Sequence, residues 1–265
     1  MEKDINYRLT VKGNVKMSSM MDSFKTSGSY ILRENGYNAV KTDLLEYILV
    51  EKNVELLEYF DPNTYQLIEY VNKLAGIYNR QHICVNDQGQ IKGLLNMPEI
   101  KEKWDVLKRE IMQVNPISSF EIIKNKDREL NDPVEVIGNL SNTHFMALFL
   151  HTYGMGPGHN ELKRIRSLPD RMGIGFMMPI IQQVKIKVEA DGYIAYSESN
   201  NDQIGWIGKQ AITKATGQEE LDIKHHSHGN FQYNTNGVLL SAELAIFEQL
   251  NLDYCTDLYL KLEVL

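Results

Sequence analysis

The sequence predicts an α+β protein with a mainly antiparallel, twisted sheet. Strand blocks at both ends of the chain form this sheet, which is expected to partly enclose a central group of helices. Three observations support this class. Apolar and polar residues alternate in the first 60 residues and again from residue 182, with helical periodicity between them. Turn motifs typical of hairpins join the strands. The regular alternation of strand and helix that a doubly wound sheet requires is missing.

The N-terminal block begins with a clear strand pattern, in which every second residue from Ile5 to Val11 is apolar. The Asn35-Gly36 dipeptide, flanked by the strand-like segments 29–33 and 37–41, predicts a tight hairpin turn. A further strand is expected over 44–50. The segment 17–29 is rich in Ser and Met, and we expect it to be a mobile loop.

The middle of the chain is expected to be mostly helical. An apolar helical face is expected over 67–78, and a hairpin over 82–95 turns at 87–89. The clearest helix starts near Pro98 and ends at Pro116, and its apolar stripe predicts that Trp104 and Ile111 are buried against the sheet. Two more helices are expected over 119–130 and 142–152. Gly154 would cap the second, and a loop would follow as far as Arg171.

From residue 182 onward the pattern predicts an antiparallel meander that ends in a strand over 254–265. Its strict alternation requires one buried face, so we expect this last strand to pair within the sheet. No linker-like segment separates the strand blocks from the helices. We therefore expect one domain, 1–265; the alternative is a division near residue 154 into 1–153 and 172–265.

Composition and charge narrow the class of protein. The chain has 265 residues and a net charge of −7, which gives no support to a nucleic-acid partner. No apolar run reaches the roughly 18 to 20 residues of a membrane span. The N-terminus lacks the apolar stretch of a signal peptide, so a cytoplasmic location is expected, although a chain with its signal already removed would look the same. Cys84 and Cys255 are expected to be buried free thiols, with one disulfide as the alternative.

A histidine-rich segment, 224–228, is the densest group of reactive side chains. On a strand, His226 and His228 would project from one face, as metal-binding imidazoles can, and His225 from the other. No third ligand follows them closely, and Lys224 would share their face and repel a cation. We therefore expect no metal site at His226 and His228, and no cofactor, because the sequence contains no cofactor-binding motif.

A glycine-rich segment, 154–158, precedes several basic residues. His159, Lys163, Arg164 and Arg166 are the candidate ligand-binding residues, for an anion. However, phosphate-binding glycine loops follow a strand and open a helix, whereas these glycines follow a predicted helix. A purely structural turn is therefore the favoured interpretation.

No nucleophile motif is present, and no catalytic residue is nominated. Tyr is abundant, with 14 residues, and Tyr193, Tyr196, Tyr233 and Tyr259 are candidates for an outward-facing recognition surface. The leading hypothesis is a non-enzymatic binding protein that presents a sheet face or concavity to a protein partner. The alternative is a carrier of an apolar small molecule in a half-barrel cavity. A third is a hydrolase that uses the histidine-rich strand.

Overall fold

The computed structural model describes residues 4–18, 20–59, 72–114, 119–158, 161–171 and 177–265, and these form a single 11-stranded antiparallel sheet. Its strands are β1 (Asp4–Met17), β2 (Met20–Tyr37), β3 (Leu45–Tyr59), β4 (Arg80–Val85), β5 (Ile91–Leu94), β6 (Glu161–Pro169), β7 (Met177–Glu189), β8 (Gly192–Asn201), β9 (Lys224–Asn234), β10 (Leu239–Asn251) and β11 (Tyr254–Val264). The order is β5-β4-β3-β2-β1-β11-β10-β9-β8-β7-β6. The first and last strands therefore meet in the middle of the sheet, and the predicted antiparallel α+β class is confirmed.

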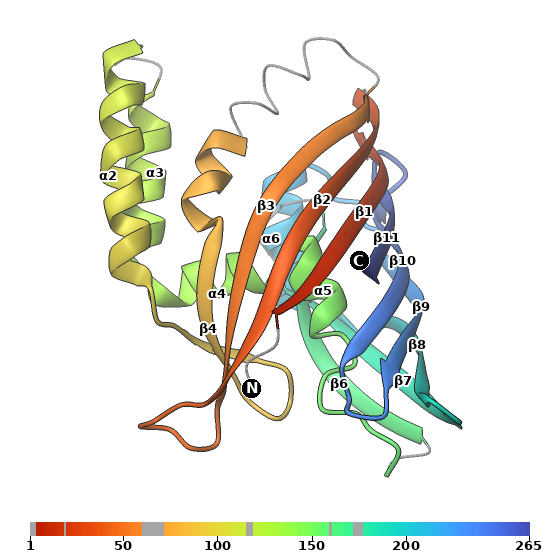
Figure 1. Cartoon of the computed structure of the whole chain (residues 1–265). Coiled ribbons are helices and arrows are strands. Elements are labelled where there is room, and N and C mark those ends of the chain that lie inside the picture. The colour runs from red at the N-terminus through yellow and green to blue at the C-terminus, as the bar shows by residue number, and fades with distance from the viewer. Residues whose placement is uncertain (1–3, 19, 60–71, 115–118, 159–160, 172–176) are drawn as a thin grey trace.

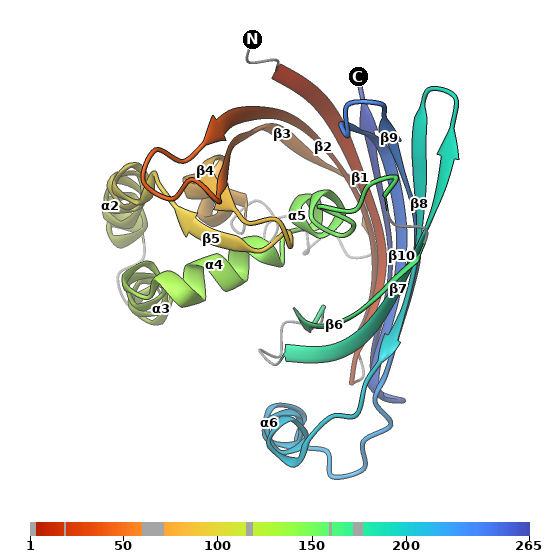
Figure 2. The same ribbon diagram turned by 90° about the horizontal axis from the view of Figure 1, so that it is seen from below.

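The helices do not form one enclosed group. They include η1 (Gly76–Tyr78), α2 (Met97–Val114), α3 (Phe120–Asn131), α4 (Pro133–Ser141), α5 (His144–Phe149) and α6 (Trp206–Thr216), and residues 72–75 before η1 are also helical. The sheet is strongly curved, and α5 lies on its concave side, whereas α2 and α3 stand beside the β4–β5 edge (Figures 1 and 2). The expectation that the sheet encloses a central group of helices is therefore not met by α2, α3 or α6.

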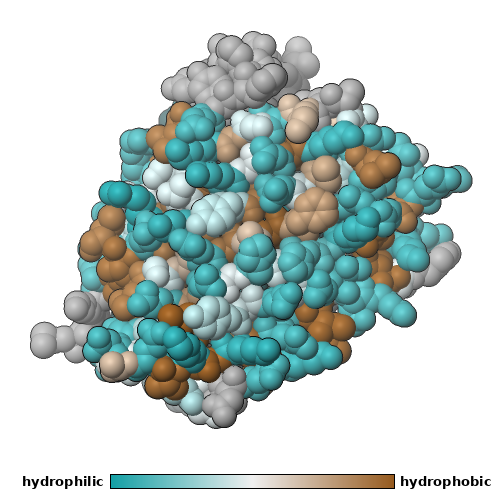
Figure 3. Space-filling model, turned by 90° about the vertical axis from the view of Figure 1, so that its right-hand side faces the viewer, coloured by the Kyte–Doolittle hydropathy of each residue, from teal (hydrophilic) through white to brown (hydrophobic). Residues whose placement is uncertain are grey.

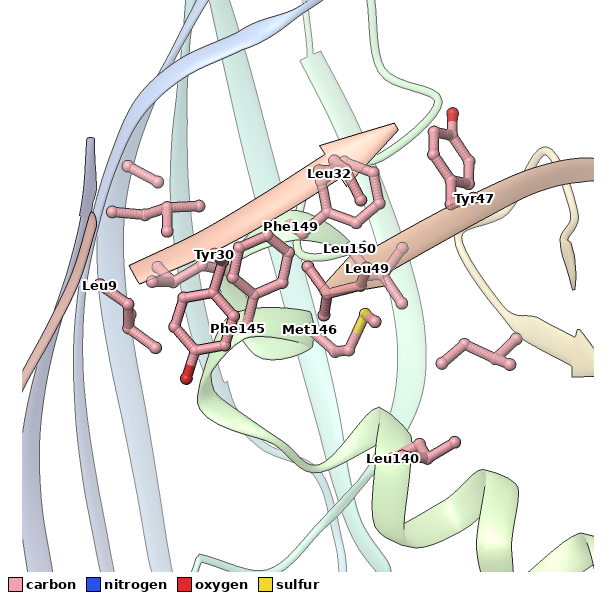
Figure 4. Packing of buried hydrophobic residues seen from close by; sticks show 14 of the residues in the cluster. Leu9, Tyr30, Leu32, Tyr47, Leu49, Leu140, Phe145, Met146, Phe149 and Leu150 are labelled. Carbon is pink, nitrogen blue, oxygen red and sulfur yellow. The ribbon is translucent and has the colours of Figure 1, made fainter. Parts of the chain in front are cut away.

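Helix α5 fills the concave side of the N-terminal strands. Its Phe145 is 2% exposed, and its ring centroid lies 5.8 Å from that of Tyr7 and 5.0 Å from that of Tyr30. Figure 4 shows Phe145 beside Tyr30. Phe149 meets the Tyr47 ring edge-on at 5.2 Å. This six-residue helix is too short to be stable alone, so its position depends on burial of these aromatic side chains.

The terminal strands follow the predicted alternation. Leu258, Leu260 and Leu262 of β11 are all buried, and β11 pairs with β1 on one side and β10 on the other. Because every backbone donor and acceptor in the middle of a sheet has a neighbouring strand, this position satisfies the hydrogen bonds of the whole C-terminal segment. The prediction that the last strand pairs within the sheet is confirmed.

Two N-terminal predictions are wrong. The segment expected to be a loop, 17–29, is largely strand, and Ser23 and Thr26 of β2 pair directly with β1. The expected turn at Asn35-Gly36 lies inside β2, where Gly36 has φ +79° and the pairing with β3 shifts register. The chain reverses later instead, where the Asn38 side-chain oxygen accepts hydrogen bonds from the backbone N–H groups of Val40 and Lys41. These side-chain hydrogen bonds form an Asx turn, which stabilises a chain reversal at Asn38 rather than at Asn35-Gly36.

The predicted α2 helix is confirmed, and Trp104 is buried at 2% exposure. Trp104 also contacts α3, because its indole N–H donates a hydrogen bond to the Asp127 carboxylate of that helix at 2.7 Å. Ile111 is only half-buried, so that part of the prediction is wrong. Part of the helix expected over 67–78, and Pro116, lie outside the described residues.

Around residue 154 the structure differs from the prediction. The helix expected over 142–152 is only α5, and α4 and α6 had not been predicted. Much of the expected loop before Arg171 is strand β6. Gly154 does not cap α5; it has φ +74°, and a Cβ there would overlap the Asp87 carbonyl. Glycine is therefore needed for the chain after α5 to pass close to the β4–β5 turn.

Two smaller points concern the cysteines and the membrane. Cys84 is buried and Cys255 half-buried, and both thiols are free, so the disulfide alternative is not realised. None of the described helices is both long and apolar enough to cross a membrane.

Candidate functional site

The inner cavity lies between α4, α5, the β4–β5 turn and the concave face of the C-terminal strands. Its volume is about 850 Å³, within the range of small-molecule sites. It is open to solvent, and several of its lining residues are exposed, among them Gln88, Gln90 and Ile165. Its lining combines apolar and polar side chains. The apolar ones include Met146, Leu150, Leu168, Leu244 and Ile246, and the polar ones include His151, Arg164, Arg166, His225 and Ser227.

Polar residues occupy inward positions of β7, β8, β9 and β10 where a sheet core is normally apolar. Gln182, Ser197, Ser199, His225, Ser227 and Glu248, here called the polar band, are each no more than 4% exposed. The strand register brings them together, because Gln182 pairs with Ser199 and Ser199 with Ser227. The band therefore crosses β7, β8 and β9 beside the cavity, and it reaches β10 at Glu248, which pairs with His225.

Hydrogen bonds connect the polar band to the segment after α5. The Ser197 hydroxyl contacts His151 Nε2 and the Gln182 amide, each at 2.9 Å. His151 also stacks on the Phe231 ring at 5.0 Å. Burial and the neighbouring arginine charges hold the pKa of His151 well below its usual range. His151 is therefore neutral near pH 7 and acts as a fixed hydrogen-bonding group.

One part of the band has the connectivity of a nucleophilic triad. His225 Nε2 lies 3.1 Å from Ser199 Oγ, and His225 Nδ1 lies 3.0 Å from Glu248 Oε1. However, Ser199 is completely buried and also bonds the Ser227 hydroxyl at 2.5 Å. Its strand is paired on both sides, so the local N–H groups are committed to the sheet and do not form an oxyanion hole. This geometry favours a structural network over hydrolysis.

Two arginines of β6 face the polar band. Even-numbered residues of this strand point inward and odd-numbered ones outward, so Arg164 and Arg166 are partly buried on one face while Lys163 is exposed on the other. Arg164 donates to Gln182 Oε1 at 2.7 Å and to the His151 carbonyl, and Arg166 donates to the same carbonyl at 3.1 Å. Of the predicted candidates, Arg164 and Arg166, here called the arginine pair, thus lie together on the inner face, and Lys163 lies on the outer face.

The arginine pair differs from Arg171, which also lines the cavity. The charges of Glu248 and Asp170 act on Arg171, and its backbone N–H donates to Glu248 at 2.7 Å. Within the described residues, Arg164 and Arg166 bond only neutral acceptors and form no ion pair. Burial, and then the charge of Arg166, lower the pKa of Arg164 to about 9.

The two weak metal-ligand candidates, His226 and His228, lie on the surface. His226 and His228 are exposed with ring centroids 5.8 Å apart, and His225 points inward as expected. Lys224 forms an ion pair with Asp222 at 2.5 Å. Among the residues that the structure describes, no group of three or more His, Cys, Asp or Glu side chains could hold a metal ion. His159 lies outside the described residues.

The expected tyrosine surface is only partly present. Tyr193 and Tyr233 are buried and stack at 4.8 Å, so they face inward. Tyr196 is 42% exposed and Tyr259 half-buried. The side of the molecule on the right of Figure 1, where β7–β10 lie, is mostly hydrophilic with scattered apolar groups (Figure 3). This face has no continuous apolar patch of the kind that marks many interaction sites.

Comparisons with known proteins bear on the fold. No protein-family model matches the sequence, and no curated protein matches it. Among solved structures, a chain described as "Lipid-protein interactions in lipovitellin" matches with a TM-score of 0.51 and 10% identity, over 99% of this chain and 25% of that chain. The fold is similar to that of part of lipovitellin. This chain spans about a quarter of the length of that chain, and at this identity the likeness concerns the fold alone.

Proposed function

We propose that the protein binds a small molecule with a long apolar part in the inner cavity, as a carrier would. The cavity itself is the observation that carries this proposal. It has a volume of about 850 Å³, opens to the surface, and is lined by apolar side chains of α5, β6 and β10. Desolvation of these side chains by an apolar ligand supplies the binding free energy, and the few polar groups orient the ligand.

The comparison supports the same class of ligand. The similar solved structure concerns lipid–protein interactions, and a curved sheet with an open concave side is suited to shelter an apolar chain. The protein-partner hypothesis has less support, because the outer face of the C-terminal strands is hydrophilic and two of its four candidate tyrosines point inward. A carrier is therefore preferred over a protein-binding module.

A fluorescent long-chain alcohol tests the proposal directly. Saturable binding at about one molecule per chain is expected, and Gly138→Leu should weaken it at least about tenfold. Gly138 of α4 lines the cavity at an exposed position, and a Cβ there would meet no atom within 4 Å, so leucine adds a bulky side chain at the cavity wall without a Cβ clash. Leucine also favours a helix more than glycine does.

Gly93→Leu is the matched control. Gly93 of β5 also has open space at its Cβ but does not line the cavity, so this variant should bind the alcohol as the wild type does. Absence of saturable binding in the wild type would refute the proposal. Equal binding by wild type and Gly138→Leu would place the ligand elsewhere and refute the inner cavity as its site.

A further inference from the structure

The arginine pair is an electrostatic anomaly of the inner cavity. Two guanidinium groups two residues apart on one strand share the His151 carbonyl as acceptor, so they lie close together and repel one another. Both are partly buried, and within the described residues neither has a carboxylate partner. Removal of a charged group from water is costly unless an opposite charge compensates. The folded protein bears this cost twice at one place.

We infer that Arg164 and Arg166 bind the acidic head group, carboxylate or phosphate, of an amphipathic ligand whose apolar tail occupies the inner cavity. This inference rests on the proposed function and names the chemical class of its ligand. A guanidinium fork matches the paired oxygens of either acid, and the resulting charge-assisted hydrogen bonds are among the strongest in proteins.

The surroundings of the pair fit an acid and exclude a cation. The His151 imidazole beside the pair is kept neutral, chiefly by burial, and its ring and the Gln182 amide are held by Ser197. Glu248, the buried carboxylate of the polar band, is engaged by His225 and by the backbone N–H of Arg171. Glu248 therefore neutralises another part of the site, and among the described residues no carboxylate compensates the arginine pair.

The position of the pair also suits an amphiphile rather than a free anion. On β6, the inward residues on either side of the pair are Leu162 and Leu168, and all four side chains line the cavity. Met146 of α5 and Leu150, the residue that follows this helix, line the same cavity. An acidic head at the arginines therefore leaves an attached hydrocarbon chain in contact with apolar side chains.

Four ligands distinguish the possible sources of the anion: a long-chain fatty acid, the alcohol of the same chain length, acetate and inorganic phosphate. The fatty acid is expected to bind at least about tenfold more tightly than the alcohol, with acetate and phosphate much weaker than both. Arg164→Gln and Arg166→Gln should each weaken fatty-acid binding about 10- to 100-fold and leave alcohol binding almost unchanged. Arg164→Lys, which keeps the charge but loses the fork, should be intermediate.

Lys163→Gln is the matched control, since it removes one positive charge from the same strand on the outer face. It should change binding less than about twofold. The comparison of acid with alcohol on the wild-type protein needs no variant, so it tests the inference even where a substitution prevents folding. Each variant is checked by circular dichroism and thermal melting.

The outcomes separate the two proposals. Equal affinity for acid and alcohol would overturn the head-group site and leave the carrier proposal intact. Binding of neither long-chain ligand would overturn both. Phosphate binding as tight as that of the fatty acid, lost in the arginine variants, would overturn the amphiphile and assign the arginine pair to a free anion.

Discussion

The dependence of the sheet on α5 can be tested by Phe145→Ala. Phe145 is 2% exposed and lies between the Tyr7 and Tyr30 rings, on the two adjacent strands β1 and β2. Truncation of a buried Phe to Ala costs about 3 to 5 kcal/mol, because transfer free energy is lost and a cavity remains. Loss of the aromatic contacts, each worth roughly 0.5 to 1.5 kcal/mol, places the expected value in the upper part of that range.

The assay is urea unfolding followed by circular dichroism and tyrosine fluorescence. With a slope of about 3 kcal/mol per M urea, a loss of about 4 kcal/mol lowers the midpoint by a little over 1 M. In thermal melting the same loss corresponds to a decrease of about 8 to 16 °C. Coincidence of the two optical signals checks that unfolding is a single transition.

Phe120→Ala provides the control, because Phe120 of α3 is 61% exposed and the same atoms are removed. Its unfolding free energy should change by no more than about 0.5 kcal/mol. A loss below about 1 kcal/mol for Phe145→Ala, at unchanged slope, would refute the conclusion that packing against these tyrosines holds α5 in place.

Three further predictions concern the C-terminus, metal binding and pH. Deletion of residues 258–265 removes most of β11, the central strand between β1 and β10, and should abolish soluble expression, whereas Leu265→Ala, at an exposed position, should not. Zinc or a chelator should leave the melting temperature of the wild type and of a double alanine variant of His226 and His228 unchanged; one tightly held equivalent of zinc would contradict this. Burial, and then the charge of Arg171, lower the pKa of His144 to about 4. Stability should therefore decrease as the pH falls from 6.5 towards 4, by up to about 3 kcal/mol, and His144→Gln should flatten this dependence in urea titrations at each pH.

The sign of the pH effect follows from the two states of His144. In the unfolded chain the imidazole takes up a proton near pH 6.5, whereas in the folded protein it stays neutral down to about pH 4. Between these values the unfolded state binds more protons, so acid favours unfolding. A wild-type protein whose unfolding free energy is constant from pH 7 to 4 would contradict this assignment.

The sequence allowed the strands of the C-terminal half to be predicted well, because their periodicity and turns are local properties. The strands β7 to β11, and the opposite orientations of His225 and His226, follow from period-two alternation alone. The long strand β2 was missed because its Ser and Met residues have weak strand propensity, and the pairing with β1 overrides that propensity. The short helix α4, capped by Asp132, carried a recognisable Asp-Pro start that was not used.

The candidate site was only partly predictable. Charge alone makes Arg164, Arg166 and Lys163 equivalent candidates, because a predicted loop does not specify which side chains share a face, whereas the structure has strand β6 there. Once β6 is recognised as a strand, alternation places Lys163 on the other face. His151, Gln182 and Glu248 come from separate parts of the chain, and their contacts depend on sheet order and register. The sequence feature that indicates the polar band is the presence of small polar residues, Ser197, Ser199 and Ser227, at strand positions that face inward.

The two halves of the sheet use their concave face differently, and this contrast bears on function. The inward residues Tyr7, Leu9 and Leu32 of the N-terminal strands bury apolar surface against α5. The corresponding face of β7–β10 carries the polar band, whose groups contribute little net stability even when every hydrogen bond is made. Replacement of such a network by apolar residues of similar volume is often neutral or stabilising. The fold alone therefore does not require the polar band or the arginine pair, and a ligand that uses their charge and hydrogen-bonding groups gives a reason for both.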